Sequence, residues 1–129
     1  MLILTIRTDK PEAELGLYED LNQLAYSTWL AHRELAETIQ YKLDELLKSQ
    51  SKQLKDISGI VVFEGPGSFT GLRIGISIAN ALAYSLDIPI VAEGDEWIAK
   101  GIDRLMNNQN DSIALPEYGS LPNITQQRK

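Results

Sequence analysis

Residues 59–86 place the strongest constraint on the fold, because they read as a strand, a glycine-rich loop and a helix in immediate succession. Ile60–Phe63 is an unbroken apolar run, which is typical of a strand buried on both faces of a parallel sheet. The glycines and proline of Gly65–Gly67 end that strand. Ser68 follows with a hydroxyl that can accept a backbone N–H of the first helical turn, so we predict it to be the N-cap.

The helix predicted over residues 71–86 has more apolar surface than one contact face requires. On a helical wheel its apolar side chains cover more than half of the circumference, whereas an ordinary surface helix has a stripe of roughly 100°. Gly71, Gly75, Ala79 and Ala83 recur at every fourth position and form a ridge of small residues. Glycine in a helix interior costs roughly 1 kcal/mol relative to alanine, so the ridge should have a use. Two uses stay open: tight packing inside the domain, and contact with a second helix or a partner subunit.

The glycine loop does not match the common phosphate-binding patterns. A P-loop ends in Gly-Lys followed by Ser or Thr, whereas Gly71 is followed by Leu72. The Rossmann pattern needs a third glycine at the position of Thr70. Backbone N–H groups at the helix start could still hold an anion, but we predict no catalytic residue and no bound cofactor here.

The remaining chain reads as strands and helices in a defined order. Apolar runs and alternation predict the strands, and the helical period predicts the helices. The predicted elements are strands Met1–Ile6, Ala13–Tyr18, Leu24–Trp29 and Ile90–Ala92, a helix Ala31–Lys48, and a short helix capped by Asp95 that runs to Leu105. With the central strand and helix, the order predicts an α/β fold with a mixed sheet, one half of a ribonuclease-H-like, actin-like architecture.

The predicted helix Ala31–Lys48 has an apolar arc wider than packing on a sheet requires. We therefore predict that it packs against the helix over residues 71–86. His32, the only histidine, lies in this arc, and Ala36 stands one turn later where a second metal ligand would be needed. A lone histidine cannot supply the three or more protein ligands of a usual metal site, so we predict a packing role and no metal.

The charge balance limits what the chain can bind. The 129 residues include 18 acidic and 12 basic ones. The resulting net charge of −6 argues against a protein that binds the phosphate backbone of a nucleic acid on its own. The absence of cysteine excludes disulfides and thiolate metal sites. We find no signal-peptide pattern and no apolar run long enough to cross a membrane, so we expect a cytoplasmic protein without membrane contact.

Residues 65–75, Gly-Pro-Gly-Ser-Phe-Thr-Gly-Leu-Arg-Ile-Gly, resemble the signature of the TsaB family. The likeness extends from Met1 to about Leu105 and resumes near the C-terminus. It implies a non-catalytic scaffold that binds a TsaD-type catalytic subunit, which transfers threonylcarbamoyl to adenosine 37 of tRNAs that read ANN codons. The tRNA would be contacted only through the complex. A TsaE-type ATPase is a further partner that the resemblance allows, and the sequence does not decide whether it docks.

Older names in the family suggest an alternative function, a peptidase or nucleotide hydrolase of the same fold. The sequence lacks a Ser-His-Asp arrangement with a credible base, a zinc site and a phosphate loop. Ser68 also has a structural role as a cap. We therefore predict a protein that is not an enzyme.

Given this resemblance, we predict that the apolar surfaces of the two long helices form the interface with the TsaD-type partner. Without the TsaD-type subunit, the same surface could form a symmetric homodimer, because a two-fold axis needs only one self-complementary patch. The predicted interface residues are Leu35, Ile39, Leu43, Gly71, Leu72, Arg73, Gly75, Ile76, Ala79, Asn80 and Ala83, and the predicted structural loop is Gly65, Pro66, Gly67 and Ser68.

Two features depart from the family pattern. TsaB-like chains usually end the first strand with Asp-Thr-Ser, where this chain has Arg7-Thr8-Asp9. The change removes an acid that helps to position a metal or the attacking group in the actin and sugar-kinase superfamily, and we interpret Arg7 as a solvated strand end. TsaB-like chains also usually continue into a second subdomain. Here we expect a TsaB-like N-terminal domain over residues 1–106, followed by a polar linker and extended tail over residues 107–129.

Overall fold

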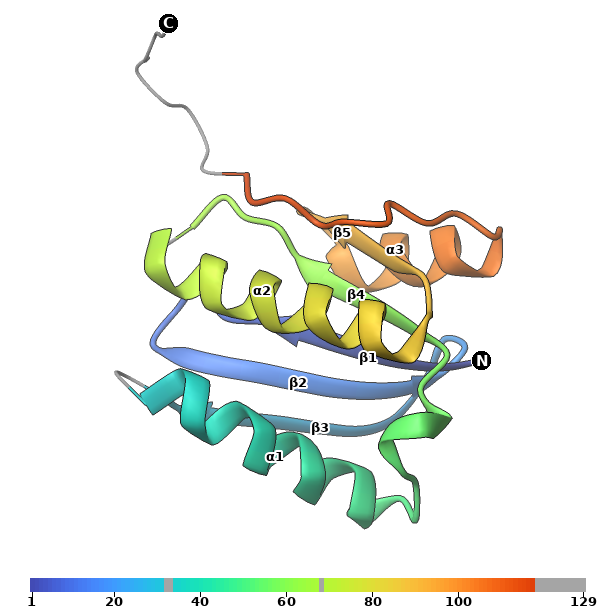
Figure 1. Ribbon diagram of the computed structural model, residues 1–129, viewed down its shortest axis with the longest axis horizontal. Coiled ribbons are helices and arrows are strands. Elements are labelled where there is room, and N and C mark those ends of the chain that lie inside the picture. The colour runs from blue at the N-terminus through green and yellow to red at the C-terminus, as the bar shows by residue number, and fades with distance from the viewer. Residues whose placement is uncertain (32–33, 68, 118–129) are drawn as a thin grey trace, which may run out of the picture.

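Five strands form one mixed sheet in the computed structural model, which describes residues 1–31, 34–67 and 69–117 (Figure 1). The order across the sheet is β3-β2-β1-β4-β5. The first three strands pair antiparallel with one another, β4 lies parallel to β1, and β5 lies parallel to β4. The strands are β1 Leu2–Arg7, β2 Glu12–Glu19, β3 Asn22–Leu30, β4 Gly59–Phe63 and β5 Ile90–Glu93.

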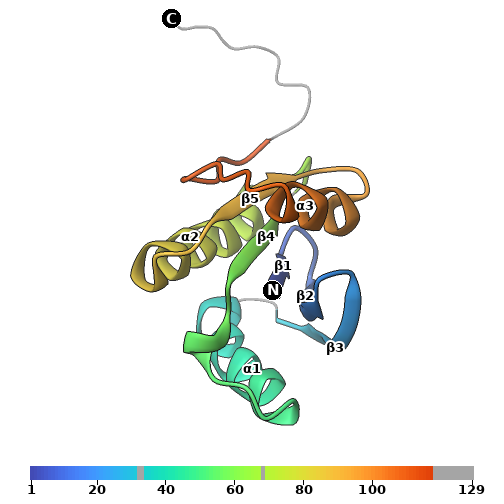
Figure 2. The same cartoon turned by 90° about the vertical axis from the view of Figure 1, so that its right-hand side faces the viewer.

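Helices cover both faces of the sheet. The helices are α1 Leu35–Ser49, α2 Phe69–Leu86 and α3 Trp97–Met106, with a short 3₁₀ turn, η2, at Leu54–Asp56. Figure 2 shows α1 and α2 on one side of the sheet and α3 on the other. The described helices include none long and apolar enough to cross a membrane.

The predicted α/β order and the ribonuclease-H-like, actin-like fold class are confirmed. Two predicted helix starts differ from the structure. The α-helix α1 begins at Leu35 rather than Ala31, and His32 lies outside the described residues. The prediction that Asp95 caps α3 is wrong, because the N-cap is Glu96 in the left-handed region (φ 54°). Trp97 then starts the helix and packs edge-to-face on Phe63, with 5.9 Å between ring centroids.

Residues 107–117, which we call the strap, run in an extended path beside β5. The N–H of Ile90 donates to Asn110 Oδ1 (3.0 Å), and the N–H of Ala92 donates to Asp111 Oδ2 (2.9 Å). The N–H of Asp111 in turn donates to the carbonyl of Ile90 (2.8 Å). The strap therefore satisfies polar backbone groups on the outer edge of the sheet.

The strap is also tied to α2 through one amide side chain. Asn80 Nδ2 donates to the carbonyl of Ala114 (3.0 Å), and Asn80 Oδ1 accepts from the N–H of the same residue (2.8 Å). Ala114 is buried between these elements. A single residue of α2 thus holds the backbone of a segment 34 positions away.

Replacing Asn80 with alanine tests this tie. Asn80→Ala should lower the free energy of unfolding by about 1–2 kcal/mol, because a buried peptide group loses both of its partners. The higher helix propensity of alanine offsets only about half a kcal/mol of that loss. Ser85→Ala, at an exposed position of the same helix, is the control. Equal urea midpoints for Asn80→Ala and the wild type would show that the strap is not held by this pair.

Candidate functional site

The loop between β4 and α2 is held against neighbouring backbone. Gly65 has φ +114°, which favours glycine, and a Cβ there would lie 2.1 Å from the carbonyl oxygen of Glu117. A Cβ on Gly67 would lie 2.6 Å from the Cβ of Asp9. The Gly65–Pro66 peptide is cis, and Ser68, the predicted N-cap, lies outside the described residues. These contacts support a structural role for the loop.

Arg7 is not the solvated strand end that the sequence suggested. Its Nε donates to Asp9 Oδ1 (2.7 Å) and its Nη2 to Asp9 Oδ2 (3.2 Å), and the Asp9 carboxylate is largely buried. The guanidinium carbon lies 3.8 Å from the centre of the Phe63 ring. The contact forms because β1 and β4 are adjacent and parallel, so their carboxyl ends lie at the same edge of the sheet. Arg7 is therefore held by Asp9 and by the Phe63 ring at the carboxyl end of β1.

The small-residue ridge of α2 faces the end of β1. The hydroxyl of Thr8 donates to the carbonyl of Gly71 (2.7 Å), and Thr8 is buried. A Cβ on Gly71 would lie 2.1 Å from the carbonyl oxygen of Thr8, and one on Gly75 would lie 2.1 Å from its Oγ1. Ala79 and Ala83 continue the ridge and are buried. The structure therefore shows that the ridge of small residues serves tight packing inside the domain.

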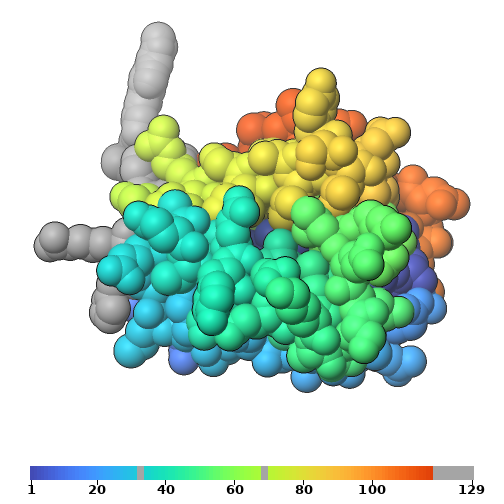
Figure 3. All heavy atoms as spheres, turned by 60° about the horizontal axis from the view of Figure 1, so that its bottom comes forward, coloured from blue at the N-terminus to red at the C-terminus, as the bar shows by residue number. Residues whose placement is uncertain are grey.

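A groove separates α1 from α2 on the outer side of the molecule. It has a volume of about 610 Å³, and the sheet residues Ile6 and Leu15 line it together with side chains of both helices. Figure 3 shows the hollow between the two helices, with part of the N-terminal segment visible inside it. The two long helices lie on the same face of the sheet (Figure 2), and the predicted packing of one against the other is limited because this groove lies between them. The helix residues in the groove include Ile39, Leu43, Leu47, Ile78 and Leu82.

The predicted interface residues separate into distinct environments. Ile39 and Leu43 line the groove, Arg73 is exposed, Asn80 holds the strap and Gly71 contacts Thr8. The others are enclosed by the fold, because they lie on the side of each helix that packs on the sheet. These enclosed residues are Leu35, Leu72, Gly75, Ile76, Ala79 and Ala83.

Sequence reasoning missed the residues of α2 that are both apolar and accessible. Ile78 and Leu82 are only partly buried and line the groove. The exposed side chains Tyr41 on α1 and Tyr84 on α2 are 64% and 90% accessible. Ile78 and Leu82 belong to the apolar arc of the helical wheel, but the predicted interface followed the ridge of small residues, which lies on the face that the fold buries.

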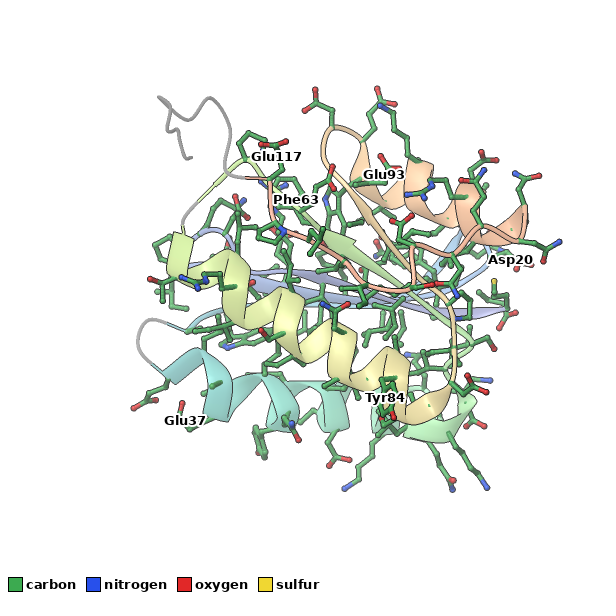
Figure 4. The ribbon with its side chains drawn as sticks, turned by 45° about the horizontal axis from the view of Figure 1, so that its top comes forward. Asp20, Glu37, Phe63, Tyr84, Glu93 and Glu117 are labelled. Carbon is green, nitrogen blue, oxygen red and sulfur yellow. The ribbon has the colours of Figure 1, made fainter. Side chains whose placement is uncertain are left out.

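Acidic side chains gather at the carboxyl ends of β4 and β5. Burial raises the pKa of the Glu64 carboxyl, and Glu93, Glu117 and Asp111 raise it further. Figure 4 shows Glu93 and Glu117 near Phe63 at this edge. Arg104 lies among them, with Nη1 bonded to Glu93 (3.1 Å) and Nη2 to Asp111. The described residues contain no group of three or more His, Cys, Asp or Glu side chains arranged to hold a metal ion.

Arg104 and Asp111 form the ion pair that fastens the strap to α3. Burial would raise the pKa of the Asp111 carboxyl, but hydrogen bonds from Arg104 and from the N–H of Ala92 outweigh it and lower that pKa. The hydrogen bond to Asp111 also raises the pKa of Arg104. The pair favours the ionised state of both groups and holds the strap in place.

Comparison with known proteins gives consistent matches. The family described as "TsaD: tRNA N6-adenosine threonylcarbamoyltransferase" matches residues 29–93. A relative from Bacillus subtilis, named tRNA threonylcarbamoyladenosine biosynthesis protein TsaB, is 39% identical over 93 residues. That alignment covers 71% of this chain and 40% of the relative, so the chain spans about two fifths of that protein's length.

Solved structures show the same fold. YeaZ from Pseudomonas aeruginosa superposes with a TM-score of 0.67 at 26% identity, over 72% of this chain and 43% of that chain. RuvC from Thermus thermophilus superposes with a TM-score of 0.54 at 13% identity, over 95% of this chain and 84% of that one. The RuvC likeness concerns the fold alone.

Substituting a glycine of the ridge tests whether α2 approaches β1 as closely as the structure shows. Gly71→Ala should destabilise the protein by about 1–3 kcal/mol, because the new methyl group would overlap a backbone carbonyl that cannot move freely. Ser77→Ala, exposed on the same helix, is the control. Because alanine is the better helix former, an unchanged or higher melting temperature for Gly71→Ala would contradict the close approach.

The pH dependence of unfolding tests the Arg104–Asp111 pair. The pKa of Asp111 is lower in the folded state than in the unfolded state. The stability that the ionised carboxylate adds is therefore complete at pH values above its unfolded-state pKa, and it is lost as the pH falls through the folded-state pKa. Asp111→Asn should therefore cost about 1 kcal/mol near pH 7 and close to nothing near pH 2. The control Asp95→Asn should differ little from the wild type at either pH. A cost for Asp111→Asn that is the same at both pH values would rule out the ion pair as its source.

Proposed function

Because this chain belongs to the TsaB family, we propose that it is a non-catalytic scaffold in the synthesis of threonylcarbamoyladenosine in tRNA. Its partner is a TsaD-type catalytic subunit, which it binds through α1 and α2. The chain matches only part of the length of its TsaB relative, so the proposal concerns the part that the match contains.

The observation that carries the proposal is the apolar groove between α1 and α2. Ile78 and Leu82 are partly accessible in this groove, and the buried side chains of Ile39 and Leu43 form part of its wall, so a partner helix could pack there. Tyr41 and Tyr84 extend the accessible surface, and exposed aromatic side chains are frequent anchors at interfaces. A chain with net charge −6 that leaves such a groove open is better suited to a protein partner than to nucleic acid.

The carboxyl end of β1 supports a non-catalytic role. The Arg7–Asp9 pair and the Phe63 ring fill the position at which the fold would present a catalytic acid. A buried carboxylate engaged by a bidentate guanidinium is poorly placed to act as a general base. The net charge of −6 suits a subunit that meets tRNA only through its partner. Docking of a TsaE-type ATPase stays a prediction from the family resemblance.

Binding to the cognate TsaD-type subunit tests the surface. Ile78→Glu places a charge among apolar side chains of the groove and should weaken binding at least tenfold, because the carboxylate would have to give up water when the partner covers it. Met106→Glu makes a similar change at an exposed position of α3, on the opposite face, and should bind like the wild type. Isothermal titration calorimetry measures both, with circular dichroism to establish that each variant folds.

Two results would overturn the proposal. One is wild-type affinity of a folded Ile78→Glu variant, which would move the interface away from the groove. The other is the absence of any complex between the wild-type chain and the TsaD-type subunit at high micromolar concentration. The second result would remove the scaffold function itself.

A further inference from the structure

The α1 side of the groove between α1 and α2 has an apolar wall and a polar rim. Three buried side chains form the wall: Ile39, Leu43 and Leu47. The residue after each of them is exposed and forms the rim: Gln40, Asp44 and Lys48. Residues four positions apart lie on one face of a helix, so wall and rim run side by side along the groove. The opposite side, from α2, adds only the apolar Ile78 and Leu82.

The charged side chains that line the groove do not balance. Asp44 and Lys48 are paired, with 3.0 Å between Oδ2 and Nζ. Lys52 is the remaining charged residue of the lining, and its ammonium group forms no ion pair with any residue that the structure describes. One acidic and two basic side chains give the groove a charge of +1, although the chain as a whole has net charge −6.

The end of α1 fixes the backbone of Lys52 at one end of the groove. Ser51 lies in the left-handed region (φ 55°), and its N–H donates to the carbonyl of Lys48 (3.0 Å). The N–H of Lys52 donates to the carbonyl of Leu47 (2.9 Å). These two bonds form a Schellman motif, in which the residue after the left-handed one frequently packs an apolar side chain on the helix. Here that residue is a lysine, and it is partly buried.

We propose that the partner segment in this groove is an amphipathic helix with an acidic side chain that pairs with Lys52, so that Lys52 selects the partner and its register. The inference rests on the proposed function, because it concerns the same groove. A partner that covers the groove takes water from the Lys52 ammonium, and a covered charge needs a group of opposite charge. Among the described residues that line the groove, Asp44 is the one acid, and it is bonded to Lys48. The partner therefore supplies the acid.

Calorimetric titration with the cognate TsaD-type subunit tests this charge pair. Lys52→Glu should weaken binding about tenfold, because two carboxylates would then meet in the covered groove. The control is Lys55→Glu, at an exposed position outside the groove lining, which should bind within about twofold of the wild type at about 0.15 M salt. Both variants replace one lysine with one glutamate, so they have the same net charge and the same long-range interaction with the partner.

Replacing Lys52 with methionine gives the sign of the interaction. Lys52→Met retains an apolar stem and removes the charge, so it should weaken binding about threefold, because the partner's acid loses its counterpart. Its affinity should also depend less on salt concentration than that of the wild type. Equal or tighter binding by Lys52→Met would show that the wild-type lysine is covered without a partner, and it would overturn the proposal.

Two further results would overturn it: wild-type affinity of a folded Lys52→Glu variant, and equal weakening by Lys52→Glu and Lys55→Glu. If Ile78→Glu loses binding while Lys52→Glu binds like the wild type, the groove remains the interface and only this inference fails. If the wild-type chain forms no complex, the proposed function and this inference fail together. Circular dichroism and melting temperatures establish that each variant folds.

Discussion

The contact between Thr8 and the glycines of α2 is the constraint on which the rest of the structure depends. The Thr8 hydroxyl bonds the carbonyl of Gly71, and neither Gly71 nor Gly75 has room for a side chain. This approach fixes the distance and rotation of α2 relative to the sheet. With that rotation set, Asn80 faces the strap, while Ile78 and Leu82 face the groove beside α1.

The carboxyl edge of the sheet is filled by interactions that stabilise the fold. Arg7 is bonded to Asp9 and stacked on Phe63, and Arg104 joins the strap to α3. The accessible apolar surface lies elsewhere, in the groove between α1 and α2 and along β3. Binding to a partner requires accessible apolar surface, and these two regions provide it.

The fold could be predicted from local patterns, and the site could not. Apolar runs and helical periods placed the five strands and three helices in the right order. The interactions that decide which surfaces are free are not local, however. Asn80 and Ala114 are 34 positions apart, and Arg7 meets Phe63 only because β1 and β4 are neighbours. The ridge of small residues in α2 predicted that another backbone packs closely against this helix, but the sequence spacing does not identify Thr8 as the residue that does so.

The central claim is that α1 and α2 present the surface for a TsaD-type subunit, and hydrogen–deuterium exchange with and without the cognate subunit tests it most directly. Amide groups of α1 and α2 should exchange more slowly in the complex, and amide groups of α3 should be unaffected, because α3 lies on the opposite face (Figure 2). Slower exchange confined to α3 or the strap, with α1 and α2 unchanged in a formed complex, would contradict the account.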